Sequence, residues 1–156
     1  SVFAKSKQAL ADIEAEDTAV VMLKFRNGAL GMIEATTAIR PKDLEGSISI
    51  LGETGSVEIG GFAVNEMKTW NFSDKQYGDD DVIDKYSVNP PNVYGFGHQA
   101  YYEHVIDCIN NKTPQLVDGL QGRKSLELIN AIYESIETGQ EVSLRFTPKF
   151  SKLGQL

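Results

Sequence analysis

The stretch Ala19-Val20-Val21-Met22-Leu23-Lys24-Phe25-Arg26-Asn27-Gly28-Ala29-Leu30-Gly31-Met32-Ile33-Glu34-Ala35-Thr36 decides the fold of this chain. Two apolar runs flank Arg26-Asn27-Gly28, and Asn-Gly between such runs is the strongest short signal for a β-hairpin. We therefore expect an antiparallel pair of strands here. The two runs place apolar side chains on both faces of the sheet, so each face needs cover.

Strand patterns continue on both sides of this hairpin. Residues 47–51 and 56–59 alternate apolar with small or polar side chains around Gly52-Glu53-Thr54-Gly55, which predicts a second hairpin. Further strand candidates are residues 1–6, 62–72 and 141–146.

Two helices are predicted in the last third of the chain. The first begins near His98 and ends before Lys112-Thr113-Pro114, because proline cannot continue it, and we expect it to lie on a sheet. The second has Asp118 as its N-cap, with Gln121 three residues later, and ends at Gly139. The first helix has an apolar stripe of Tyr101, Tyr102, Val105, Ile106, Cys108 and Ile109, and the second one of Leu128, Ile129, Ile132, Tyr133 and Ile136.

Strands that come first and helices that come late, without βαβ alternation, indicate the α+β class. We expect residues 1–156 to form a single domain, with an open, mainly antiparallel sheet of about six strands and helices packed on one face. Two helices cannot cover both faces of such a sheet. Sheet-to-sheet association into a homo-dimer or tetramer would cover the other face, and the alternative is a face with scattered exposed apolar side chains.

Composition excludes several classes of function. The chain has 156 residues and a net charge of −7, from 15 Lys+Arg against 22 Asp+Glu, and this field repels nucleic acid and anionic membranes. No apolar run approaches the ~20 residues that span a bilayer. Cys108 is the single cysteine, which excludes an internal disulfide framework. We expect a cytoplasmic protein. The start at Ser1-Val2-Phe3, without methionine, suggests a domain excised from a longer chain.

The most informative stretch for chemistry is Tyr94-Gly95-Phe96-Gly97-His98-Gln99. Two glycines there bring the backbone close to a ligand just before a helix begins, where free N–H groups and the helix dipole favour an anion such as phosphate. His98 adds a donor, and Tyr94 or Phe96 can pack on a flat ring. The alternative is structural: the glycines serve the turn, Phe96 belongs to the core and His98 caps the helix.

A second candidate is the cationic strand end at Arg40 and Lys42, which suits a carboxylate or phosphate, although an ordinary solvated loop explains it equally well. Cys108 reads as an inert core residue, since nothing nearby in the sequence would make a thiolate. We predict no metal site, because His98 and His104 lack a helical ligand spacing and a third ligand. No Gly-x-Gly-x-x-Gly pattern opens a βαβ unit, so no cofactor site and no catalytic residues are predicted in this chain.

Four segments resemble the C-terminal half of the glucose-fructose oxidoreductase/inositol dehydrogenase (Gfo/Idh/MocA) family. They are residues 19–31, residues 48–57, Gly97-His98-Gln99 and residues 118–127. Within that family, residues 94–102 and 142–148 look most like dehydrogenases that oxidise UDP-N-acetylglucosaminuronic acid at C3 during synthesis of bacterial surface sugars.

The resemblance implies an open antiparallel sheet used for dimer and tetramer contacts, with helices facing a cofactor domain. It implies that NAD or NADP, the family's Glu-Lys-Pro lysine and its catalytic histidine belong to sequence upstream of Ser1, so that this chain alone is inactive. The substrate contacts it implies here are Tyr94, Gly97 and His98, with Arg40 and Lys42 as further candidates. Two other interpretations stay open: a self-standing assembly module, and a non-catalytic homologue that binds a sugar.

Overall fold

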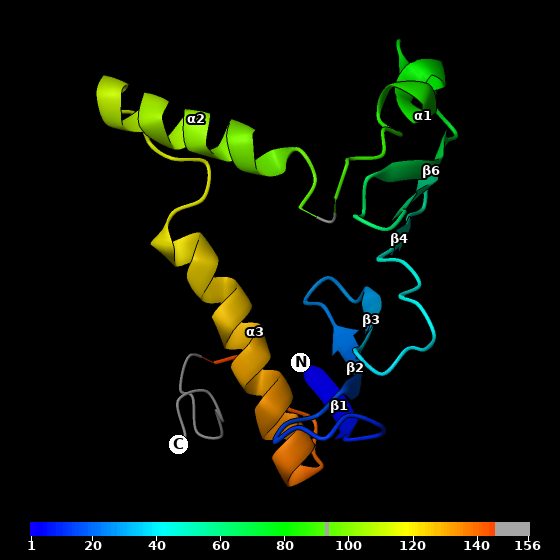
Figure 1. Cartoon of the computed structure of the whole chain (residues 1–156), viewed down its shortest axis with the longest axis vertical. Helices are drawn as coiled ribbons and strands as arrows, with labels where there is room; N and C mark the ends of the chain where they lie inside the picture. The colour runs from blue at the N-terminus through cyan, green and yellow to red at the C-terminus, as the bar shows by residue number, and fades with distance from the viewer. Residues whose placement is uncertain (93, 146–156) are drawn as a thin grey trace. The chain divides into compact units, whose positions relative to one another are not determined.

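The structure, a computed structural model, describes residues 1–92 and 94–145 (Figure 1). Its strands are β1 (Val2–Lys7), β2 (Thr18–Lys24), β3 (Leu30–Thr36), β4 (Ile48–Leu51), β5 (Gly55–Gly60) and β6 (Glu66–Phe72). Its helices are the 3₁₀ helix η1 (Asp79–Asp81), α1 (Val82–Lys85), α2 (Gly97–Asn111) and α3 (Gly119–Thr138). The strands form two three-stranded antiparallel sheets, in the orders β1-β2-β3 and β4-β5-β6, which confirms the α+β class.

The chain divides into two compact units, which are described separately. Unit 1 contains Ser1–Ile39 and the chain from Leu116 onward, and unit 2 contains Arg40–Gln115. Unit 1 therefore combines the first sheet with α3, and unit 2 combines the second sheet with η1, α1 and α2.

The hairpin of β2 and β3 forms where the Asn-Gly signal predicts it. Gly28 has a φ of 92°, which is the left-handed region that favours glycine, and the N–H of Ala29 donates to Asn27 Oδ1 at 3.2 Å. In the resulting register Val21 pairs with Ala4 of β1 on one side and with Ile33 of β3 on the other.

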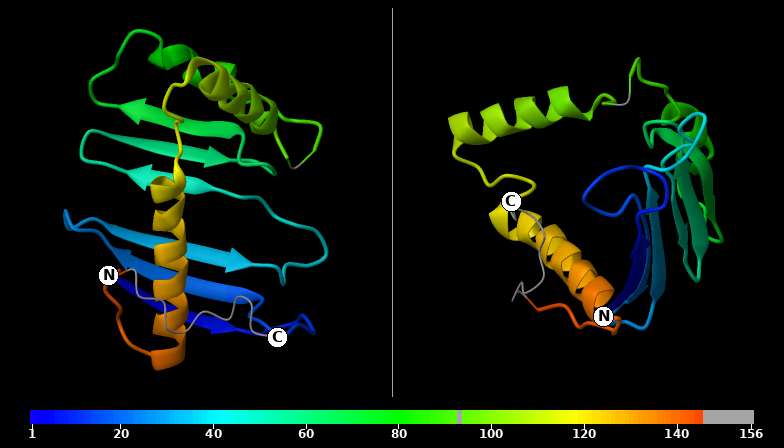
Figure 2. Two further views of the ribbon diagram at one scale, coloured as in Figure 1. Left: turned by 90° about the vertical axis from the view of Figure 1, so that its left-hand side faces the viewer. Right: turned by 60° about the horizontal axis from the view of Figure 1, so that its bottom comes forward.

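Helix α3 lies across one face of the β1-β2-β3 sheet (Figure 2). The helix begins as predicted, because Asp118 accepts a hydrogen bond from the N–H of Gln121 at 2.8 Å, and it ends at Gly139 with a φ of 68°. Between helix and sheet lies the core, made of Val2, Ala4, Val21, Ala131 and Val142, with Leu23, Ile132 and Ile136 packed against it.

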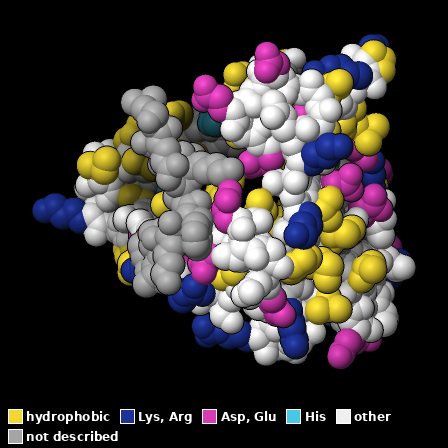
Figure 3. All heavy atoms as spheres, turned by 90° about the horizontal axis from the view of Figure 1, so that it is seen from below, with side chains coloured by type: hydrophobic (Ala, Val, Ile, Leu, Met, Phe, Trp, Pro, Cys, Tyr) yellow, Lys and Arg dark blue, Asp and Glu magenta, His cyan; other side chains and the backbone are white. Residues whose placement is uncertain are grey.

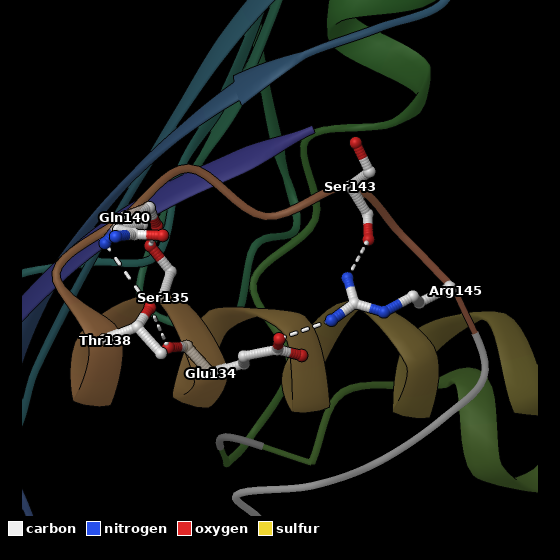
Figure 4. A network of polar contacts seen from close by, with 6 residues as sticks. All are labelled: Glu134, Ser135, Thr138, Gln140, Ser143 and Arg145. Carbon is white, nitrogen blue, oxygen red and sulfur yellow. Dashed lines mark hydrogen bonds and ion pairs between the residues drawn. The ribbon is translucent and has the colours of Figure 1, made fainter.

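A fully buried serine joins the helix to the edge strand. The Ser135 hydroxyl accepts the N–H of Ala4 at 3.0 Å and donates to the carbonyl of Gln140 at 2.6 Å. Around the same helix end, Arg145 forms an ion pair with Glu134 and donates to the carbonyl of Ser143 (Figure 4). The last turn of α3 is thus fixed to both β1 and the segment that follows the helix.

The strand predicted at residues 141–146 is reduced to a single bridge. Val142 exchanges two backbone hydrogen bonds of 2.8 Å with Val2, and the residues beside it are not extended strand. Phe146 lies outside the described residues. The alternation of this segment therefore reflects the burial of Val142 in the core more than a full strand pairing.

Asp17 closes the loop between β1 and β2. Its buried carboxylate accepts the N–H groups of Ala9 (2.8 Å), Leu10 (2.7 Å) and Ala11 (2.8 Å), and the hydroxyl of Thr18 at 3.0 Å. The N–H groups of Ala11, Leu10 and Ala9 hold the pKa of this carboxyl far below its usual range. This arrangement was not predicted, because it depends on an irregular loop whose sequence has no periodic pattern.

In unit 2 the second predicted hairpin is confirmed as β4 and β5, and the predicted strand at residues 62–72 is confirmed as β6. Gly55 lies under its cross-strand partner Phe72, whose ring would be 2.3 Å from an added Cβ. η1 and α1, which the sequence did not predict, follow β6, and Trp70 Nε1 donates to Asp79 Oδ1 at 3.0 Å. α1 packs on β6.

The prediction that the first long helix lies on a sheet is wrong for this unit. α2 has the expected bounds, but it shares no extensive packing with the strands described in unit 2, and Ile106 and Ile109 are exposed. An amphipathic pattern shows that a helix face needs a partner without showing which one.

In the described ranges, 1–92 and 94–145, no helix has the length and apolar character to cross a membrane.

Replacing Ser135 with alanine should lower the free energy of unfolding by about 1–2 kcal/mol, because it leaves the buried N–H of Ala4 without an acceptor. Urea denaturation measures the change. Ser125→Ala, at an exposed position of the same helix, is the matched control and should be neutral or slightly stabilising. Equal effects of the two variants would contradict the role given to Ser135.

Asp17→Asn should lower the melting temperature by several degrees at pH 7. Because folding lowers the pKa of Asp17, its carboxylate stabilises the fold above the pKa of an unfolded aspartate, about 4, and this contribution is lost as the pH falls further. The difference from the wild type should therefore shrink between pH 4 and pH 2 in thermal melts. Asp12→Asn, exposed in the same loop, is the matched control and should melt within about a degree of the wild type at pH 7.

Candidate functional site

A tight turn precedes α2 in the stretch from Tyr94 to Gln99, which the sequence analysis singled out. The carbonyl of Asn92 accepts the N–H of Gly95 at 3.3 Å, and its side-chain Oδ1 accepts the N–H of Tyr94 at 3.0 Å. Gly95 has a φ of 66°, so the turn needs glycine at this position. Asn92 was not among the predicted site residues, although asparagine three residues before glycine is a turn signal.

The turn places two predicted site residues side by side. The rings of Tyr94 and His98 meet edge to face, with centroids 6.1 Å apart and planes at 65°. Both side chains are exposed, and Tyr94 retains 72% of its surface. The pair therefore offers an aromatic face together with an imidazole hydrogen-bonding group to a ligand from outside.

The start of α2 is open beside this pair. Phe96 occupies the N-cap position without a side-chain hydrogen bond to the helix, so His98 is not the cap that the structural alternative supposed. A Cβ added at Gly97 would meet nothing within 4 Å, and Gly97 does not have a positive φ. The backbone N–H groups at the first turn are thus free of side-chain capping and accessible to an anionic group.

The two cationic candidates belong to another part of unit 2. Arg40 and Lys42 lie in the connection between β3 and β4, and both side chains are exposed. Lys42 makes no hydrogen bond or ion pair within the described parts of the chain. Of the five predicted residues, the structure brings together Tyr94, Gly97 and His98.

Cys108 has a neighbour that the sequence analysis missed. The thiol is buried as predicted, but His104, one turn earlier on α2, places Nε2 3.4 Å from Sγ, and the carbonyl of Pro114 lies 3.6 Å from Sγ. The sequence analysis did not name this neighbour, although the i,i+4 spacing on the helix could have revealed the pair. Over residues 1–92 and 94–145, no group of three His, Cys, Asp or Glu side chains is arranged to hold a metal ion.

A family model described as the C-terminal alpha/beta domain of the Gfo/Idh/MocA oxidoreductase family matches residues 1–144. The chain belongs to this family. The comparison with curated proteins gave no significant match.

Two solved structures are similar to this chain over most of its length. The WlbA dehydrogenase from Bordetella pertussis, in complex with NADH and UDP-GlcNAcA, is 42% identical with a TM-score of 0.86, over 94% of this chain and 42% of that one. The WlbA dehydrogenase from Chromobacterium violaceum, with the same two ligands, is 43% identical with a TM-score of 0.82, over 94% of this chain and 40% of that one. This chain thus spans about two fifths of the length of these dehydrogenases.

An oxidoreductase from Agrobacterium radiobacter shares the fold at lower identity. It is 20% identical with a TM-score of 0.68, over 92% of this chain and 42% of that one. At this identity the likeness concerns the fold alone.

Asn92→Ala should raise the solvent exchange rate of the Tyr94 amide roughly fivefold, since a hydrogen bond of this kind contributes about 1 kcal/mol. Amide exchange followed by NMR measures the rate. Asn92→Asp keeps an oxygen acceptor and should stay close to the wild type. Unchanged exchange in the alanine variant would show that the Asn92 side chain does not hold the turn.

Proposed function

We propose that this chain is the substrate-binding and oligomerising domain of an NAD-dependent dehydrogenase that oxidises a sugar hydroxyl. The proposed substrate is a UDP-N-acetyl-hexuronic acid, oxidised at C3, in the synthesis of surface polysaccharides. The observation that supports this most is 42–43% identity over 94% of the chain to two dehydrogenases solved with NADH and UDP-GlcNAcA.

The candidate site suits the rings and the diphosphate of such a substrate. A sugar nucleotide has flat or puckered rings and a diphosphate, and these groups match an exposed aromatic pair beside an uncapped helix start. Tyr94 and His98 would contact a ring or hydroxyl, and the backbone at Gly97 would receive an anionic oxygen. Arg40 and Lys42 are proposed as further contacts for a carboxylate or phosphate.

NAD or NADP does not fit the residues described here. All strand pairings in residues 1–92 and 94–145 are antiparallel, so this part of the chain offers no βαβ unit, and Gly28 and Gly31 belong to the β2–β3 hairpin. We therefore assign the cofactor and the hydride transfer to the remainder of a longer protein, and we derive no catalytic step in this chain.

The proposal includes assembly and location. Exposed apolar side chains on β2 and β3, among them Met22 and Met32, support a homo-dimer or tetramer formed through a sheet face. The single cysteine fits a cytoplasmic protein.

His98→Ala should weaken the binding of UDP-N-acetylglucosaminuronic acid about tenfold in calorimetric titrations, because the ligand loses one polar partner. Gln99→Ala, one position along the same helix, is the matched control and should bind as the wild type does. Equal affinity of the wild type and His98→Ala would show that His98 does not contact this ligand. If the longer protein failed to reduce NAD with every UDP-hexuronic acid tested, the proposed substrate would be wrong. Membership of the family would stand.

A further inference from the structure

The tip of the β2–β3 hairpin contains the single Asn-Gly pair of the sequence, Asn27-Gly28. Residues 24–30 are all exposed, and a Cβ added at Gly28 would meet nothing within 4 Å among the described residues. In Figure 2 the turn forms the free end of the two strands. Water therefore reaches both the side chain of Asn27 and the peptide bond that follows it.

This pair has the groups that an asparagine needs to lose its amide without an enzyme. The Gly28 nitrogen can close a five-membered ring on Cγ of Asn27, and it is unhindered because glycine has no Cβ. Oδ1 of Asn27 accepts the N–H of Ala29 at 3.2 Å, and this donor stabilises the negative charge that develops on Oδ1 during the attack. Within the described residues Nδ2 of the same amide makes no hydrogen bond, so nothing retains it as the leaving group.

The charges around the turn favour the same reaction. Lys24 and Arg26 are exposed and flank the pair, and lysine and arginine side chains project from the surface in several places in Figure 3. A pocket beside Phe25 is lined by these two cations and by one carboxylate, Glu127 of α3. The attack requires the Gly28 nitrogen to lose its proton, and an excess of positive charge nearby favours the anion that results.

We propose that Asn27 is a site of spontaneous deamidation, with water as the co-reactant. The bond from the Gly28 nitrogen to Cγ of Asn27 forms, the bond from Cγ to Nδ2 breaks, and ammonia leaves with the proton that Gly28 gave up. Water then opens the cyclic imide at one of its two carbonyl carbons. Opening at Cγ gives aspartate, and opening at the main-chain carbonyl gives isoaspartate. No oxidation or reduction is involved.

The native turn slows this reaction without preventing it. The N–H of Gly28 donates to the carbonyl of Phe25 at 3.1 Å, and this bond must open before the nitrogen can attack. One neutral hydrogen bond corresponds to a factor of about five in the population that is ready to react. Because the tip of a hairpin can open without the sheet behind it, the folded chain remains reactive.

The two products have different effects on the hairpin. Aspartate keeps an oxygen acceptor for the N–H of Ala29, and Asp-Gly is itself a favoured turn sequence. Isoaspartate lengthens the main chain by one carbon, about 1.5 Å, inside a turn closed by the N–H of Phe25 and the carbonyl of Ala29. Aspartate therefore preserves the register of β2 and β3, and isoaspartate opens the pair nearest the turn.

Peptide mapping by mass spectrometry tests the site. During incubation of the folded chain in mildly alkaline buffer, the peptide that contains Asn27 should gain about 1 Da as an amide becomes a carboxyl group. It should do so at least about tenfold faster than the peptide that contains Asn71, which precedes the bulky Phe72. Asn27→Gln would need a larger ring, so it is the matched control and should gain no mass at this position. A faster gain at Asn71 would overturn the proposal.

The same incubation in urea separates the folded chain from the unfolded one. Asn27 in the folded chain should react within about tenfold of its rate in the unfolded chain. A folded chain that is more than about a hundredfold slower would show that the native turn protects Asn27, and the proposal would be overturned.

Amide exchange by NMR tests the two products. The Phe25 amide of Asn27→Asp should exchange within about twofold of the wild type, because Asp-Gly fits the turn. The isoaspartyl fraction of an aged sample, separated by chromatography, should exchange this amide at least about fivefold faster, since the bond to Ala29 is lost. Equal exchange in the two products would overturn the effect on the hairpin.

Discussion

The contact between α3 and β1 is the interaction on which unit 1 depends. Ala4, Ala131 and Ser135 are small and buried, so the helix can approach the strand closely. The Ser135 hydroxyl satisfies the N–H of Ala4 at an edge where the sheet has no further strand. Val142 pairs with Val2 on the same edge. With the β1 edge closed and one face covered by α3, the opposite face of the sheet is left uncovered by the described residues of unit 1.

The parts of the fold that could be predicted from the sequence have local causes. Asn27-Gly28 determines its hairpin because only a few residue types adopt the required turn, and Gly139 ends α3 for the same reason. Asp118 starts α3 through a hydrogen bond to a residue three positions away. Such signals need no knowledge of distant contacts, and each corresponds to a feature found in the structure.

The parts that could not be predicted depend on distant contacts or on very short elements. η1 and α1 have three and four residues, too few to show a helical period. Asp17 is buried by an irregular loop, and Val142 by a strand at the other end of the sequence. In the candidate site, the glycines, the tyrosine and the histidine were visible in the sequence. The ring contact of Tyr94 with His98 was not, because it follows from the turn that Asn92 holds.

An antiparallel sheet constrains where a ligand can bind in this domain. Parallel sheets gather helix N-termini and loop residues at one edge, and an antiparallel meander does not, so no single sheet edge marks a binding site in this chain. Among the described residues, the connection before α2 combines an exposed aromatic pair with an uncapped helix start.

The solved structures differ widely in their sequence identity to this chain. The fold is retained at 20% identity in the Agrobacterium radiobacter oxidoreductase, so the 42–43% identity shared with the two UDP-GlcNAcA-bound dehydrogenases exceeds what the fold alone requires. The likeness to these two dehydrogenases therefore extends beyond the architecture to the identity of many individual residues.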